Sequence, residues 1–271
     1  MAKPQLWIVA GPNGSGKTTL TMRHLKRFPT NIPVVNPDEI AKDINPGQID
    51  SPKVALQAGK QALRQQRDLL VSRQSFLIET TFSGNHELRL IGKAQEQGYK
   101  VNLIYIALRD ATRNISRVAS RVAAGGHNIP TVDIIRRYGR SLRNAPKGIF
   151  SADRTFVVDN SRKRHQLLFT RKHGLIQFVT PEVQQPEWSS NVLLGYEQEQ
   201  LKDLQQYVGT SAKSELLREL ADCMLEAGIK FNIRIKQLRQ YAGVLNVTPE
   251  EKMLPSVKSV LRRMECGLKR C

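Results

Sequence analysis

A chain of 271 residues can form one large α/β domain, or a domain of about 150–200 residues with an appendage. Hydrophobic residues make up 40% and charged residues 24%, which excludes a disordered tail, and 18 glycines and 13 prolines exclude a collagen-like design. The formal net charge is +18, and residues 1–163 alone contribute +14. Such a surface attracts nucleotides, nucleic acids or anionic lipids without choosing among them.

The chain has no segment that resembles a signal peptide or a membrane span. The first apolar run is only Leu6–Ala10, and no run approaches the ~20 apolar residues that a spanning helix needs. The three cysteines, Cys223, Cys266 and Cys271, form no Cys-x-x-Cys pair, which argues against a disulfide framework or a structural zinc site. We therefore expect a cytoplasmic protein in a reducing compartment.

Short apolar runs alternate with longer helical patterns through the first 160 residues. Continuous apolar strands between helices are typical of a parallel sheet that is covered on both faces. Because crossover connections are right-handed, we expect an α/β fold, a doubly wound three-layer parallel sheet. The expected strands are residues 6–10, 33–36, 75–80, 101–107 and 155–159.

The alternation weakens after Ser161. Residues 167–169 and 176–179 predict a small hairpin, and the Pro/Gln/Ser-rich stretch 180–191 has the composition of a linker or surface loop. From about residue 211 the pattern is helical, and Leu217, Leu220 and Met224 share one face. We therefore divide the chain into an N-terminal α/β domain (1–163), a hairpin and linker region (164–200) and a mainly helical C-terminal extension (201–271).

A glycine-rich segment between the first strand and the following helix matches the P-loop pattern G-x-x-x-x-G-K-[ST]. The motif is Gly11-Pro12-Asn13-Gly14-Ser15-Gly16-Lys17-Thr18. In such a loop inward-facing amides and the helix N-terminus hold phosphate oxygens. The lysine reaches the β and γ phosphates, and the hydroxyl holds Mg²⁺. The motif predicts binding of a nucleoside triphosphate but does not identify a phosphate acceptor.

Two carboxylates follow strands that end at the expected ligand edge of the sheet. Asp38 can take the proton of an attacking hydroxyl or complete a magnesium shell; alternatively, it caps the helix that begins near Ile40. Glu79 resembles the metal-associated acid of P-loop proteins, or is a buried structural carboxylate held by threonine hydroxyls. Thr81 and Ser83 either bond substrate hydroxyls or close a turn.

Four arginines recur at every fourth position, so they line one helix face: Arg109, Arg113, Arg117 and Arg121. Like charges at that spacing repel, which favours an anionic partner, although a solvated face is the alternative. A turn at residues 125–130 and the pair Arg136-Arg137 follow. This pattern predicts a lid that closes arginines over a transferring phosphoryl group.

Together these segments resemble the zeta-toxin family of P-loop kinases. The resemblance rests on Ala10–Thr19, Asn36–Ile40, Glu79–Gly84, Arg117–His127 and Asp159–Ser161. It implies a kinase that transfers the γ-phosphoryl of ATP, with Mg²⁺, to a hydroxyl of a nucleotide sugar such as UDP-N-acetylglucosamine.

The resemblance also implies roles for individual residues. Asp38 would be the general base, and Lys17, Arg121 and Arg137 would act on the phosphoryl group. Gly11–Thr19, including Thr18 and Thr19, would bind ATP, with Asn160 near the adenine. Glu79, Thr81 and Arg117 would contact the acceptor, and Thr18 and Glu79 the metal.

The partners expected are an anionic small-molecule substrate and an antitoxin or regulatory protein. Two other functions stay open. A polynucleotide or nucleoside kinase would use the same arginines along a nucleic-acid backbone, although only 6% of the residues are aromatic. A non-catalytic nucleotide-binding regulator would use the helical extension to dock a partner.

Overall fold

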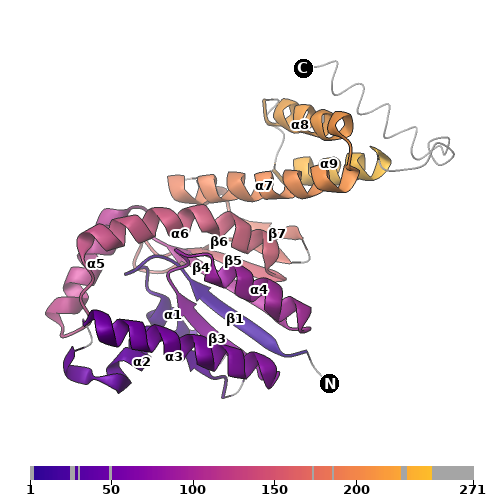
Figure 1. Cartoon of the computed structure of the whole chain (residues 1–271). Coiled ribbons are helices and arrows are strands. Elements are labelled where there is room, and N and C mark those ends of the chain that lie inside the picture. Colours follow the sequence, from indigo (N-terminus) through magenta and orange to yellow (C-terminus); the bar gives the residue numbers. More distant parts are fainter. Residues whose placement is uncertain are drawn as a thin grey trace. The chain divides into compact units, whose positions relative to one another are not determined.

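The computed structural model describes residues 3–24, 28–29, 31–48, 51–172, 174–184, 186–226 and 231–245 (Figure 1). The chain forms two compact units, residues 1–192 and 193–271. The part of the expected helical extension beyond residue 245 lies outside the described residues.

A seven-stranded sheet forms the centre of the first unit, in the order β2-β3-β1-β4-β5-β6-β7. The first five strands are parallel, and β6 and β7 add an antiparallel hairpin to the edge of β5. The predicted strands and the predicted hairpin are confirmed. The strands are β1 (Gln5–Ala10), β2 (Val34–Val35), β3 (Phe76–Thr80), β4 (Lys100–Ala107), β5 (Arg154–Asp159), β6 (Gln166–Lys172) and β7 (Leu175–Val179).

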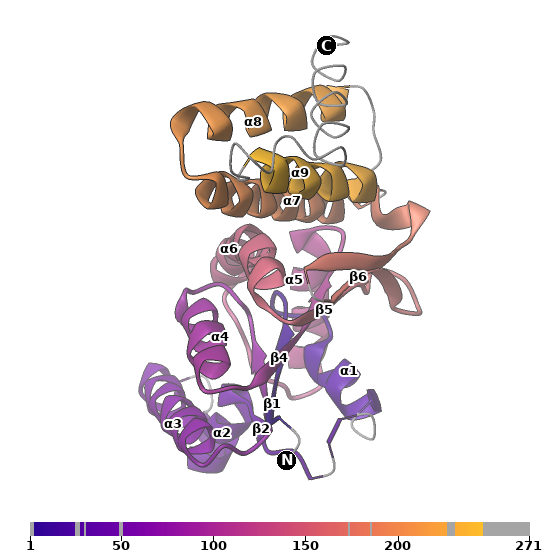
Figure 2. The ribbon, with the colours of Figure 1, turned by 90° about the vertical axis from the view of Figure 1, so that its right-hand side faces the viewer.

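Helices cover both faces of this sheet, which confirms the predicted three-layer α/β fold. Figure 2 shows α1 on one face and α3, α4 and α6 on the other. The helices of this unit are α1 (Lys17–His24), α2 (Pro37–Ile44), α3 (Pro52–Val71), α4 (His86–Glu96), α5 (Ala111–Ala123), α6 (Thr131–Ser151) and the start of α7 (Glu187–Val208), with short 3-10 turns at Pro46–Gln48 and Pro181–Gln184.

The buried strands explain why the sequence shows continuous apolar runs. In β1, Leu6, Ile8, Val9 and Ala10 are all fully buried, although successive residues point to opposite faces of the sheet. Trp7 packs edge-on against Phe28 with ring centroids 4.9 Å apart, on the α1 side. Because both faces of β1 are covered, its C-terminal end is held rigidly where the glycine-rich loop begins.

The loop after β3 is fixed by a buried aromatic side chain. Phe82 is fully buried with φ of 57°, a conformation that costs a bulky residue of order 1–3 kcal/mol. Asn144 of α6 donates its amide to the carbonyls of Phe82 and Gly84, at 3.1 and 3.0 Å. The surrounding structure therefore holds Thr81 and Ser83 at a defined place at the edge of the sheet.

The stretch expected to be a linker is partly helical, which corrects the interpretation of residues 180–191. A 3-10 turn covers Pro181–Gln184, and α7 begins at Glu187. Trp188 and Val192 are buried, and the Trp188 ring lies 6.2 Å from that of Tyr105. These two apolar side chains anchor the segment to the first unit. The composition of the stretch did not predict this, because most of the neighbouring residues are polar.

The second unit contains the rest of α7 with α8 (Ser211–Glu226) and α9 (Phe231–Leu245). Leu217, Leu220 and Met224, expected to share a face, are buried together with Leu238 and Tyr241. Cys223 of α8 is disulfide-bonded, although the spacing of the three cysteines argued against a disulfide framework. The second unit therefore has its own hydrophobic core.

None of the helices within the described residues is both long enough and apolar enough to cross a membrane.

Gly148→Ala tests the anchor beneath the loop that follows β3. A Cβ at position 148 would lie 2.5 Å from Cζ of Phe82, so we expect a loss of about 1–3 kcal/mol in the free energy of unfolding. The measurement is urea denaturation followed by circular dichroism. Gly139→Ala on the same helix is the control, because its Cβ would meet only Arg143 Nη1, at 3.5 Å, and we expect it to be neutral or stabilising. An equal change in the free energy of unfolding for the two substitutions would contradict the role of Phe82 packing against α6.

Candidate functional site

The glycine-rich loop between β1 and α1 has the backbone of a phosphate-binding loop. Gly11, Gly14 and Gly16 have φ of 147°, 74° and 95°, conformations that side chains with a Cβ rarely adopt. The loop runs directly into the N-terminus of α1 at Lys17, where free amides and the helix dipole favour an anion. The local geometry thus follows from the three glycines at their observed spacing.

Side chains from two later elements support the loop from outside. Asn114 of α5 donates to the carbonyl of Asn13, and Asn160, after β5, donates its amide to the carbonyl of Ser15 at 2.8 Å. Arg117 donates in turn to the carbonyl of Asn160 at 2.7 Å. Asn160, which the sequence analysis expects near the adenine, therefore also stabilises the conformation of the glycine-rich loop.

The P-loop lysine is directed onto its own loop in this structure. Lys17 Nζ donates to the carbonyls of Gly11 and Pro12, at 2.8 and 3.0 Å. Loss of hydration on burial lowers the pKa of Lys17 to about 8, against the opposing effect of Glu79 and Asp38. Arg121 and Arg137 lower this pKa further. The two carboxylates and the two arginines therefore all lie close enough to Lys17 to change the pKa of its ammonium group.

A buried carboxylate joins three neighbouring strands. Glu79 of β3 is 7% exposed, and its Oε2 accepts from Thr18 Oγ1 at 2.7 Å and from Asn36 Nδ2 at 3.0 Å. Thr18 follows β1 and Asn36 follows β2, and β3 lies between these two strands. The strand order therefore dictates that Glu79 reaches both partners.

Asp38 is not the cap of α2. That role belongs to Asn36, whose Oδ1 accepts from the backbone amide of Asp38 at 3.0 Å, with Pro37 at the first helical position. The exposed Asp38 side chain lies in the first turn of the helix. Since capping does not require this carboxylate, it is free for chemistry in the adjoining cavity.

A cavity of ≈ 1250 Å³ brings most of the predicted site residues together. From the loop it is lined by Asn13, Gly14, Gly16, Lys17, Thr18 and Thr19. From other elements it is lined by Asp38, Glu79, Thr81, Arg117, Arg121, Arg137 and Asn160. Gly11, Pro12 and Ser15 belong to the same loop but do not line the cavity. One cavity therefore holds both the loop and the proposed acceptor-side residues.

The row of arginines divides into two pairs with different surroundings. Arg117 and Arg121 line the cavity, and Arg121 Nη2 donates to the carbonyl of His127 at 2.7 Å. Of the pair on α6, Arg137 lines the cavity, whereas Arg136 forms an ion pair with Asp133 at 2.7 Å. Helical spacing alone does not separate these cavity-facing arginines from the others.

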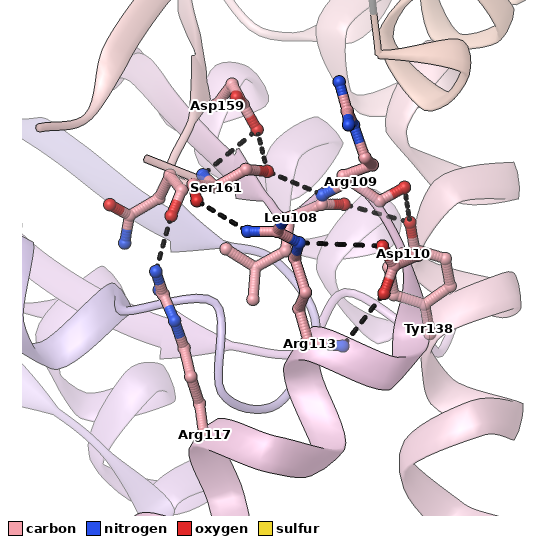
Figure 3. A network of polar contacts seen from close by, with 9 residues as sticks. Leu108, Arg109, Asp110, Arg113, Arg117, Tyr138, Asp159 and Ser161 are labelled. Carbon is pink, nitrogen blue, oxygen red and sulfur yellow. Dashed lines mark hydrogen bonds and ion pairs between the residues drawn. The ribbon is translucent and has the colours of Figure 1, made fainter. Parts of the chain in front are cut away.

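The other two arginines of the row belong to a network at the root of α5 (Figure 3). The backbone amide of Arg109 donates to Ser161 Oγ at 2.7 Å, and Arg113 Nη1 donates to the carbonyl of Ser161 at 2.9 Å. Ser161 Oγ donates in turn to Asp159 at 2.6 Å. These contacts fasten the start of α5 to the loop after β5, which corrects the expectation that all four arginines form one lid face.

The donor set suits a magnesium ion bound together with a nucleotide. Mg²⁺ prefers oxygen ligands and is usually held by one or two carboxylates plus substrate phosphates. Thr18 Oγ1 and Glu79 Oε2 are such oxygens, 2.7 Å apart beside the phosphate-binding loop. The described residues contain no group of three or more His, Cys, Asp or Glu side chains arranged to bind a metal alone. A nucleotide would therefore have to supply further ligands.

Sequence reasoning missed several side chains that the cavity contains. Asn36 donates to the carboxylate of Glu79 and accepts from the backbone amide of Asp38. The signal was present, since an asparagine before Pro37 is typical of a helix cap. Residues of α3 and α4, among them Gln66 and His86, line the cavity without a local motif. Only the folded chain reveals this second group.

Comparison with known proteins fits this geometry. A family model described as an AAA domain (AAA_33) matches residues 6–141. The chain belongs to this family. A protein of Haemophilus influenzae, described only as uncharacterized, is 33% identical over 146 residues, which are 51% of this chain and 100% of that protein.

Solved structures share the fold of this AAA domain. The AvrRxo1-ORF1:-ORF2 complex with ATP has a TM-score of 0.55 at 17% identity, over 70% of this chain and 64% of that one. The PezAT chromosomal toxin–antitoxin system of Streptococcus pneumoniae has a TM-score of 0.52 at 17% identity, over 73% and 85%. At such identity the likeness shows a P-loop kinase-like fold. The chain spans less than two thirds of the AvrRxo1-ORF1 structure's chain.

The lowered pKa of Lys17 predicts a pH dependence of nucleotide binding. Below about pH 8 the ammonium is already charged; above it, a bound triphosphate must restore the charge by raising the pKa. We therefore expect ATP affinity to be constant below pH 8 and to fall above it, by up to roughly tenfold for each pH unit. Isothermal titration calorimetry in two buffers of different ionisation enthalpy should show proton uptake near pH 8. Binding without uptake would contradict a neutralised Lys17.

Asn36→Asp separates the two contacts of the cap residue. An aspartate still caps α2 but loses the donor to Glu79 and places a second carboxylate beside it. We expect the magnesium dependence of nucleotide binding to shift to roughly 10–100-fold higher Mg²⁺. Thermal stability should also fall, because two carboxylates would then lie side by side in a buried place. The control is Asn36→Ala, which loses the cap as well and should lower stability by about 1 kcal/mol. An Asn36→Asp protein with wild-type magnesium dependence would refute the proposed role of the Asn36–Glu79 hydrogen bond in magnesium binding.

Proposed function

We propose that this chain is an ATP-dependent phosphotransferase that moves the γ-phosphoryl group to a hydroxyl of an anionic small molecule. A nucleotide sugar such as UDP-N-acetylglucosamine is the acceptor we propose first. The observation that carries the proposal is the single cavity that contains both the phosphate-binding loop and the exposed carboxylate of Asp38. A protein that only bound nucleotide would have no use for an unpaired base beside the loop.

ATP would occupy the β4–β5 side of the cavity. The loop amides and Lys17 would bind the β and γ phosphates, and Asn160 would lie beside the nucleoside, next to Arg117. Thr18 and Glu79 would hold Mg²⁺, which when bound neutralises charge on the phosphates. For this, Lys17 would leave the carbonyls of its own loop and turn to the phosphate oxygens.

The acceptor would enter from the β2–β3 side. Asp38 follows β2, and Glu79 and Thr81 end or follow β3, so the strand order supports placing an acceptor hydroxyl among them. Asp38 would accept the hydroxyl proton while the oxygen attacks the γ-phosphorus. Thr81 bonds Ser83 at 2.9 Å, an internal contact that an acceptor hydroxyl would replace or extend.

Cations on the lid side would stabilise the charge that develops on the transferring group. Arg121 and Arg137 both line the cavity, and both lower the pKa of Lys17. Guanidinium groups held near a phosphoryl group stabilise the charge that is spread over its equatorial oxygens. Arg117 lies on the same helix face as Arg121 and would contact the acceptor or the donor phosphates.

The charge of the cavity supports an anionic acceptor. Nine lysines and arginines line it against three carboxylates, more than one triphosphate with its metal requires. None of the side chains described as lining it is phenylalanine, tyrosine or tryptophan, so it offers no stacking platform for single-stranded nucleic acid. These observations favour a small anion over a polynucleotide.

We further propose that a protein partner restrains the enzyme, as in a toxin–antitoxin pair. The two structural relatives described above support this proposal, since one contains AvrRxo1-ORF1 with AvrRxo1-ORF2 and the other is described as a toxin–antitoxin system. An ATP-dependent toxin of this kind would act in the cytoplasm, where ATP is present.

Asp38→Asn tests the proposed base. The amide keeps the shape but cannot accept a proton, so we expect transfer from labelled ATP to UDP-N-acetylglucosamine to fall by roughly 10²–10⁴-fold while ATP affinity is unchanged. The matched control is Asp43→Asn on the same helix, exposed and outside the cavity, which should keep full activity.

Loss of ATP binding in Asp38→Asn would make this carboxylate a structural or metal residue instead. Label appearing on 5′-hydroxyl oligonucleotides rather than on the nucleotide sugar would favour the polynucleotide kinase alternative. Mass spectrometry of a phosphorylated metabolite extract extends the same assay to other acceptors.

A further inference from the structure

One face of α3 exposes apolar surface inside the cavity. Leu56, Gly59 and Leu63 are spaced by three and four residues, so they form one stripe along the helix. The two leucines are 61% and 45% exposed, although large apolar side chains are normally buried. This stripe faces a space that the protein itself does not fill.

Gly59 at the centre of the stripe has no structural reason to be glycine. It lies in the middle of a 20-residue helix, where glycine is less stable than alanine. Its φ is not positive, and a Cβ built on it would meet no protein atom within 4 Å. Neither backbone conformation nor packing therefore requires glycine, and the open space above it belongs to the cavity.

Polar and charged groups border the stripe. Lys60 of α3 and Arg89 of α4 line the same cavity. Gln66, 7% exposed, bonds His86 with 2.8 Å between Oε1 and Nε2. The stripe is apolar and is flat at Gly59, with hydrogen-bonding groups at one end and cations beside it. Such a surface is complementary to a planar ring that carries an anionic group.

We propose that this α3 stripe binds the planar ring of the acceptor, and that Gly59 is a specificity-determining residue. The ring would lie on the backbone at Gly59 between Leu56 and Leu63, with the acceptor's phosphate near Lys60 or Arg89. This inference rests on the proposed phosphotransferase function and deepens it. The acceptor class is a compound with a base-like ring and a phosphate.

The stripe belongs to the acceptor and not to ATP. It lies on α3, which belongs to the connection between β2 and β3, the two strands whose C-terminal ends lie next to Asn36 and Glu79. The groups beside the nucleoside of ATP, Arg117 and Asn160, come from the opposite side of β1, after β4 and β5. Figure 1 shows α2 and α3 beside each other.

The experiment compares Gly59→Leu and Gly59→Ala with a matched control, Gly92→Ala. Gly92 is also within a helix, has nothing within 4 Å of its Cβ and does not line the cavity. Both alanine variants should raise the melting temperature by roughly 2–4 °C, since alanine favours the helix. Only the Gly59 variants should change acceptor binding, so a folding defect is not confused with a lost contact.

Binding is measured by titration calorimetry with a non-hydrolysable ATP analogue filling the donor site. The probes are UMP, which carries ring and phosphate, and N-acetylglucosamine 1-phosphate, which carries the phosphate without the ring. We expect Gly59→Leu to weaken UMP at least tenfold and Gly59→Ala to weaken it severalfold. Binding of the sugar phosphate and of the ATP analogue should change less than twofold.

Two results would overturn the inference: equal UMP affinity in wild type and Gly59→Leu, or no preference of the wild type for UMP over the sugar phosphate. Both results are measurements of binding and do not depend on phosphoryl transfer. The phosphotransferase function is tested separately by product formation in wild type and Asp38→Asn, so a ring site without transfer and transfer without a ring site are distinguishable.

Discussion

The carboxylate of Glu79 is the contact on which the rest of the site depends. A buried carboxylate is costly unless hydrogen bonds and nearby cations compensate for lost hydration. Here the hydroxyl of Thr18 and the amide of Asn36 both donate to it, and Lys17 is close enough for its pKa to respond. One side chain on the middle strand therefore ties the phosphate-binding loop to the start of α2. The position of Asp38 follows from this tie, since its backbone amide is bonded to Asn36.

The arginine-bearing helix α5 is held by hydrogen bonds at both of its ends. Tyr138 donates its hydroxyl to the carbonyl of Leu108 at 3.0 Å. Burial, with nearby acidic groups, raises the pKa of Tyr138 to about 12, so it stays a donor at neutral pH. Together with the contacts to Ser161, this bond fixes the start of α5. At the other end of α5, Arg121 Nη2 donates to the carbonyl of His127 at 2.7 Å, and a Cβ on Gly126 would lie 2.6 Å from Cγ of Arg121. Contacts at both ends of the helix therefore hold the arginines that line the cavity.

The sequence predicted those parts of the fold whose signals are local. Buried parallel strands read as apolar runs, and the phosphate-binding loop needs glycines at fixed positions, so both were correctly placed. The addition of the hairpin to β5 was not predictable, because strand order depends on contacts between distant segments. The start of α7 was missed because Trp188 and Val192 are the only apolar side chains buried among its first six residues. The sequence did not predict the stripe around Gly59. The pattern of leucines on a helix does not show whether an exposed leucine faces bulk solvent or a cavity.

The excess of positive charge links the sequence to the site. Like charges gathered around one cavity repel each other. Lost hydration is the main cause of the lowered pKa of Lys17, which Glu79 and Asp38 oppose, and Arg121 and Arg137 lower this pKa further. A protein selected for stability alone would place these arginines apart. Their convergence is favourable only when anions occupy the space between them, because the anions then relieve repulsion that the empty fold must bear. The net +14 of the first 163 residues is therefore best understood as a property of the protein with its ligands bound.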